Sequence, residues 1–89
     1  MEIKIATRVC RDPEGAGRTF TYYLTVDQEK SSRFTCENYG VHIVEEPNRD
    51  SACLPGLTTS AARIDQLMTL LVDNRVGPAG LADLVADWL

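Results

Sequence analysis

The last third of the chain carries two stripes of apolar residues at helical spacing. In residues 64–72 and 81–89, apolar positions recur three and four residues apart, as is typical of a helix with one buried face. The first stripe comprises Ile64, Leu67, Met68, Leu70, Leu71 and Val72, and the second comprises Leu81, Leu84, Val85, Trp88 and Leu89. We therefore predict helices at about 59–73 and 78–89.

The ends of these helices also have sequence signals. Thr58, Thr59 and Ser60 can each accept a free backbone N–H, and we favour Thr58 as the N-cap of the first helix. Asn74 is expected as its left-handed C-terminal residue. Gly77 and Pro78 suit the cap and the first position of the second helix.

The first half of the chain alternates between apolar and polar residues, which predicts strands within residues 2–54. Residues 3–9 and 19–26 are expected to form an antiparallel hairpin around a turn at 11–17, followed by a loop at 27–32. A third strand is predicted over 33–45, where Phe34 and Cys36 have one parity and Tyr39, Val41 and Ile43 the other. We expect a bulge at 38–40 to turn both sets toward the core. A short edge strand follows at 52–54.

These elements predict an α+β fold in a single domain over residues 1–89. A small antiparallel sheet of three to four strands is followed by a C-terminal α-helical hairpin packed on one face. The covered face is expected to bear Ile3, Ile5, Val9, Phe20, Tyr22, Leu24, Val26, Val41 and Ile43. The open face is then a candidate interaction face centred on Tyr23, formed by Lys4, Arg8, Thr21, Tyr23, Thr25, His42 and Val44.

Charge and composition leave the predicted fold unchanged, but they exclude several classes of partner and location. The net charge is −4, and the nine basic residues are scattered among thirteen acidic ones, so we expect no nucleic-acid partner. No apolar run is long enough to span a bilayer, and the first residues lack the apolar run of a signal peptide. Three cysteines, an odd number, are unlike a secreted disulfide framework. We expect a cytoplasmic protein.

Cys10, Cys36, Cys53 and His42 have the ligand count of a zinc site. However, no two of the cysteines are close in sequence, and packing residues are the favoured interpretation. A Cys–His nucleophile pair would need a thiol of lowered pKa in a cleft, which a small sheet rarely provides. We therefore expect no metal, no cofactor and no small-molecule ligand.

Other patterns have structural explanations. Glu45 and Glu46 are adjacent on a strand and should point apart, whereas Asp83 and Asp87 share a solvated helix face. Residues 15–17, Gly-Ala-Gly, lead into a strand and not into the helix N-terminus that a phosphate loop requires. The second helix carries no basic residue, which argues against a DNA-reading helix-turn-helix.

Three segments resemble a family of small uncharacterised proteins of anaerobic Firmicutes, a domain of unknown function. They are the aromatic strand at 20–24, the segment at 39–44, and the tail at 70–78 and 81–89. That family often has serine before the proline, where this chain has Gly77. The resemblance implies no activity, cofactor or catalytic residue.

The sequence contains no catalytic constellation, so we do not expect an enzyme. The leading hypothesis is a non-enzymatic cytoplasmic protein-interaction or regulatory domain, acting on a protein partner or through self-association. One alternative is a small phage or mobile-element inhibitor that binds a host nuclease. Another is a metal-binding or cysteine-based enzyme using Cys10, Cys36, Cys53 and His42.

Overall fold

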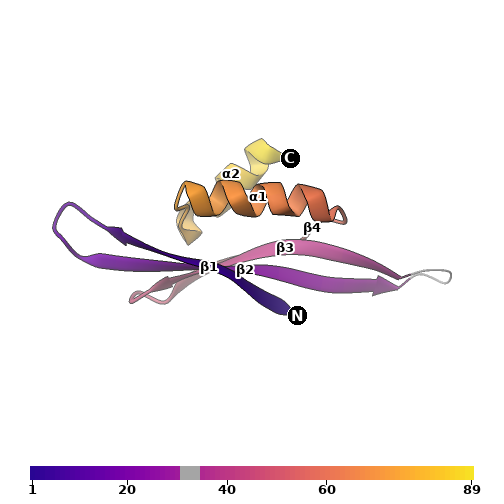
Figure 1. Cartoon of the computed structure of the whole chain (residues 1–89), viewed down its shortest axis with the longest axis horizontal. Coiled ribbons are helices and arrows are strands. Elements are labelled where there is room, and N and C mark those ends of the chain that lie inside the picture. Colours follow the sequence, from indigo (N-terminus) through magenta and orange to yellow (C-terminus); the bar gives the residue numbers. More distant parts are fainter. Residues whose placement is uncertain (31–34) are drawn as a thin grey trace.

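The computed structural model describes residues 1–30 and 35–89, in which a four-stranded antiparallel sheet is followed by two helices (Figure 1). Each strand pairs with the next along the chain, so the sheet order is β1-β2-β3-β4. The elements are β1 (Glu2–Arg11), β2 (Gly17–Lys30), β3 (Thr35–Glu46), β4 (Asp50–Thr58), α1 (Ala61–Asp73) and α2 (Pro78–Trp88). The predicted α+β fold is confirmed.

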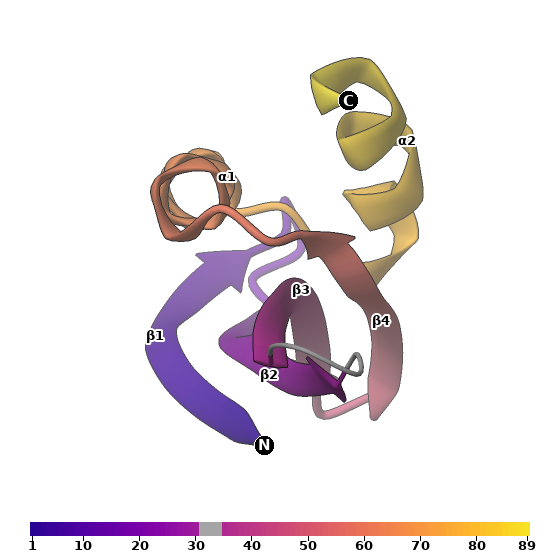
Figure 2. The same cartoon turned by 90° about the vertical axis from the view of Figure 1, so that its right-hand side faces the viewer.

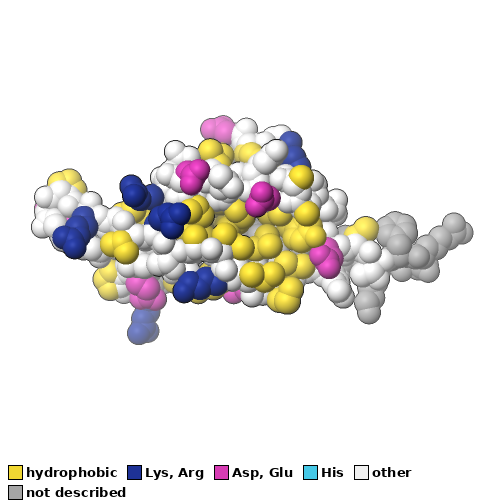
Figure 3. Space-filling view, viewed as in Figure 1, with side chains coloured by type: hydrophobic (Ala, Val, Ile, Leu, Met, Phe, Trp, Pro, Cys, Tyr) yellow, Lys and Arg dark blue, Asp and Glu magenta, His cyan; other side chains and the backbone are white. Residues whose placement is uncertain are grey.

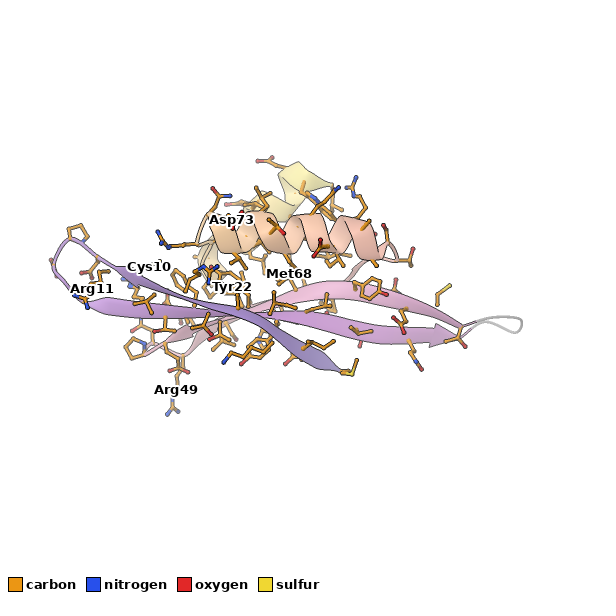
Figure 4. All side chains as sticks on the ribbon, in the orientation of Figure 1. Cys10, Arg11, Tyr22, Arg49, Met68 and Asp73 are labelled. Atoms are coloured by element: carbon orange, nitrogen blue, oxygen red, sulfur yellow. The ribbon has the colours of Figure 1, made fainter. Side chains whose placement is uncertain are left out.

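Both helices cover the same face of the sheet, α1 on the side of β1 and α2 on the side of β4 (Figure 2). Tyr22 and Met68 lie between the sheet and α1 (Figure 4). The apolar side chains buried between the layers are Phe20, Tyr22, Val41, Ile43, Ile64, Leu67, Met68, Leu71, Val72, Leu81 and Val85. Among the described residues, neither helix has the length and hydropathy that a membrane crossing requires.

The caps of α1 differ from the prediction by one or two residues. Ser60, not Thr58, is the N-cap, and its Oγ accepts the backbone N–H of Arg63 at 3.2 Å. Thr58 still belongs to β4, and its hydroxyl accepts the N–H of Ser60. At the other end Arg75, not Asn74, takes the left-handed conformation, with φ 51°. The Asn74 side chain instead donates to the carbonyl of Leu70 one turn back.

The strands are longer than predicted. Residues 27–30, expected in a loop, continue β2 and pair with residues 35–38 of β3. Residues 31–34, which include the rest of that loop and Phe34, lie outside the described residues. At the other edge, β4 runs to Thr58 instead of ending at 54. Cross-strand pairing therefore overrides the polar composition that favoured a loop at 27–30.

A bulge in β1 changes which residues face the helices. Ile5 is an extra residue between Lys4, opposite Tyr23, and Ala6, opposite Tyr22. Before this bulge the odd-numbered residues of β1 face the helices, and after it the even-numbered residues do. Val9, predicted inside, therefore lies on the open face and is 61% exposed. The prediction for Val9 is wrong because strand parity holds only where no residue is inserted.

The expected bulge in β3 lies in the neighbouring strand instead. β3 pairs with β2 without interruption, so Cys36 and Tyr39 stay on opposite faces. The irregularity is between β3 and β4, where residues 55–57 stand opposite the single residue Gly40. A Cβ on Gly40 would lie 2.3 Å from the carbonyl oxygen of Leu54 and 2.5 Å from the Cα of Pro55. Only glycine lets β4 approach so closely.

Candidate functional site

Four residues form a row across the open face, one from each strand. Lys4 stands opposite Tyr23, Tyr23 opposite His42, and His42 opposite Cys53. The Tyr23 and His42 rings are 5.6 Å apart between centroids and tilted by 33°. Oε2 of Glu2 lies 2.7 Å from Nδ1 of His42, within hydrogen-bonding distance. This row brings the two aromatic rings of the open face, Tyr23 and His42, next to the charged side chains of Lys4 and Glu2.

Six of the seven predicted interaction residues lie on this face. Lys4, Tyr23 and His42 belong to the row, and Thr21 stands opposite Val44 in the next one. Arg8 does not join them. It stands opposite Phe20, because the Ile5 bulge turns the second half of β1 over. The placement of Arg8 is therefore corrected, whereas use of the open face as an interaction surface stays a prediction.

Thr25 is on the open face but is not accessible. It is 5% exposed, and its Oγ1 has no hydrogen-bond partner among the described residues. Thr25 stands opposite Gly40, where the backbone of β4 approaches most closely, and its Oγ1 is 2.7 Å from the Cβ position of that glycine. The accessible part of the open face is therefore smaller than the sequence indicates.

The three thiols do not form one site. Cys10 stands opposite Arg18 on the helix-covered face, whereas Cys36 and Cys53 lie on the open face, and all three are free. Burial raises the pKa of the Cys53 thiol, and the negative charges of Glu2 and Asp27 raise it further. A raised pKa keeps the thiol protonated, which is the opposite of nucleophile activation. In residues 1–30 and 35–89, no three His, Cys, Asp or Glu side chains gather in a metal-binding arrangement.

The remaining sequence patterns have structural roles. The chain from 12 to 16 is the hairpin turn between β1 and β2, where Oδ1 of Asp12 accepts the N–H groups of Glu14 and Ala16. Glu45 and Glu46 point to opposite faces, as predicted, and only Glu45 is buried.

Glu45 lies in a hollow of about 260 Å³ at the start of α2. Nη1 of Arg18 is 3.8 Å from its carboxylate, and Nδ2 of Asn48 donates to it at 3.2 Å. Gly77 has no side chain to cap α2 and lies next to this carboxylate. A negative charge here complements the positive end of the helix, so the buried acid has a structural explanation.

A second surface, which the sequence did not predict, lies where the edge strand β1 meets α1. Figure 3 shows hydrophobic side chains gathered there. Ile3 and Ile5 are 42% and 46% exposed, and Met1 is more exposed still. Beside them is a groove of about 150 Å³ lined by Ile5, Ala6, Asp65, Met68, Thr69, Val72 and Asp73. We call Met1, Ile3 and Ile5 the β1 edge patch.

This patch is left uncovered by the helices. Ile3 and Ile5 both lie on the helix side of β1, as the alternation of a regular strand also places them. However, the helices pack on the second half of that strand, where Ala6 and Cys10 contact the core. No signal in the sequence identifies Ile5 as an inserted residue.

The model of one protein family, a family of unknown function designated DUF6514, matches residues 1–89. The chain belongs to DUF6514. No curated protein and no solved structure matches it. Membership in DUF6514 agrees with the resemblance in the strand and tail segments, and it assigns no activity to the residues described above.

Proposed function

We propose that this DUF6514 chain is a non-enzymatic protein-interaction domain that docks its partner along the outer edge of β1. One observation carries the proposal: the first half of β1 is an edge strand whose apolar side chains, Ile3 and Ile5, face the helix side yet remain exposed. Exposed strand edges with apolar side chains are templates for pairing with another chain.

The two edges of the sheet differ in a way that supports this choice. The outer edge of β4 contains Pro55, which has no N–H, and Gly56 in a left-handed conformation with φ 64°. Both features interrupt strand pairing at this point of the β4 edge. β1 contains neither proline nor glycine, and its residues 1–4 pair with β2 regularly up to the bulge at Ile5. This asymmetry favours the start of β1 over the end of β4 as the pairing edge.

The Tyr23-centred face supports a contact less well. Thr25 is covered by β4, and the rings of Tyr23 and His42 already lie beside each other, 5.6 Å apart between centroids. The raised pKa of Cys53 gives no support to a cysteine-based enzyme.

The same proposal places the interaction in the cytoplasm. The chain has an odd number of thiols and all three are free, which is typical of a reducing compartment. The family resemblance points to anaerobic Firmicutes as the native hosts.

Site-specific photo-cross-linking in the native host tests the proposal. A photoreactive amino acid replaces Ile5, and a control variant carries it at the exposed Asp83 on α2. We expect a discrete protein adduct from position 5 and not from position 83. Absence of any adduct at position 5, or equal adducts at both positions, would contradict the proposal.

A further inference from the structure

The hydrogen bonds between β1 and β2 determine which backbone groups of β1 face outward. The terminal ammonium group of Met1 donates to the carbonyl of Val26 at 3.1 Å, and the carbonyl of Met1 accepts the N–H of Val26 at 2.8 Å. In an antiparallel pair such doubly bonded positions alternate with positions whose N–H and C=O point away from the partner strand. Glu2 and Lys4 are the next positions of the second kind, so their backbone groups point outward along the free edge.

We infer that the occupant of this edge is a second copy of the chain, paired through residues 1–5 about a two-fold axis at Ile3. This inference rests on the proposed function and names its partner. In this register Glu2 of one copy stands opposite Lys4 of the other. The outward groups of each then exchange two backbone hydrogen bonds, four in the dimer.

Charge favours this register over the two adjacent registers, in which the two-fold axis passes through Glu2 or Lys4. Shifting the axis to Glu2 places two glutamates opposite each other, and shifting it to Lys4 does the same with two lysines. Like charges directly opposite across a strand pair destabilise it, whereas opposite charges stabilise it. Only the axis at Ile3 aligns the outward backbone groups and pairs Glu2 with Lys4 twice.

The apolar side chains agree with the same register. Ile3 meets its own copy, and Met1 meets Ile5 of the partner. The β1 edge patches of both copies thus form one continuous apolar strip on the helix side, as an isologous interface requires. The bulge at Ile5 falls at the end of the paired segment and does not interrupt it. The start of β1 also turns away from the helices, which leaves room for a second sheet (Figures 1 and 2).

Sedimentation velocity over a range of micromolar concentrations tests the inference. We expect twice the mass of the chain at the upper end for the wild type. Lys4→Glu should weaken the dimer about tenfold, because both cross-strand pairs become repulsive. Adding Glu2→Lys to that variant restores opposite charges and should recover most of the affinity. Arg11→Glu, the same charge change on β1 outside the paired segment, should have no effect.

Disulfide trapping tests the register independently. Residues that face each other at a two-fold axis lie close enough for a disulfide, so Ile3→Cys should oxidise to a covalent dimer above the wild-type background. Ile5→Cys, which faces Met1 of the partner, should not.

A chain that stays monomeric at every concentration, or a dimer unaffected by Lys4→Glu, overturns the inference. If the photo-cross-linker at position 5 then captures only a different protein, the proposed function stands and the second copy is excluded as its partner.

Discussion

Replacing Tyr22 by phenylalanine removes a hydrogen bond that ties the middle of the sheet to the connection between the helices. The Tyr22 side chain is completely buried, and its hydroxyl donates to the carbonyl of Val76 at 2.9 Å. A typical hydrogen bond contributes about 1 kcal/mol net, and an acceptor left without its donor costs more. We expect Tyr22→Phe to lower the free energy of unfolding by about 1–2 kcal/mol.

The same residue makes stability depend on pH at the alkaline end. Burial raises the pKa of Tyr22 from 10.0 to about 12. Below pH 10 the phenol is protonated in both states and the full stabilisation is present. Between pH 10 and 12 the unfolded chain releases this proton while the folded chain retains it, so stability falls. The difference corresponds to about 2 kcal/mol by pH 12.

Urea denaturation of wild type and Tyr22→Phe at pH 7 to 12 measures both effects. Other groups titrate in this range, so the informative quantity is the difference between the two proteins at each pH. We expect the variant to be less stable than the wild type at pH 7. This difference in the free energy of unfolding should shrink to zero or change sign as the pH approaches 12. Tyr23→Phe, which removes a hydroxyl from the open face, is the matched control. A constant gap across this range would refute the assignment of the alkaline loss to Tyr22.

Two further predictions concern backbone positions. Gly40→Ala places a methyl group against Leu54 and should lower the free energy of unfolding by about 1–3 kcal/mol. Gly80→Ala lies in a helix, where the nearest heavy atom is 3.6 Å away, and should raise the free energy of unfolding by about 0.5–1 kcal/mol. Equal melting temperatures of the two variants would contradict both expectations. Ser60→Ala removes the N-cap of α1 and should cost about 1 kcal/mol, measured in urea. Thr59→Ala, at an exposed position that caps nothing, should change stability by less than half of that, and the reverse order would show that α1 is capped elsewhere.

The periodicity of the chain was enough to predict both helices, the hairpin and the inside position of Tyr22. These depend on patterns that repeat along one element, and burial of the apolar side enforces them. The position of Val9 could not be predicted in this way. A bulge depends on how β1 meets β2, and the residues around Ile5 alternate no differently from those of a regular strand.

The candidate site was harder to predict than the fold. His42 and Tyr23 share a face by simple parity, so their proximity followed from the pattern. Exposure of Ile3 and Ile5 did not follow, because an apolar strand residue is expected to be buried unless the length of the covering helix is known. The choice of Ser60 over Thr58 likewise depends on where β4 ends, which is a property of the sheet and not of the helix.

The sheet order has a consequence for synthesis on the ribosome. Because each strand pairs with its immediate predecessor, residues 1–58 hold every strand before either helix has been made. The surface around Tyr22 and Ile43 is then complete but without its cover until the last thirty residues emerge. Nascent chains paused at that stage expose a large apolar surface, and a chaperone or rapid docking of α1 must protect them from aggregation.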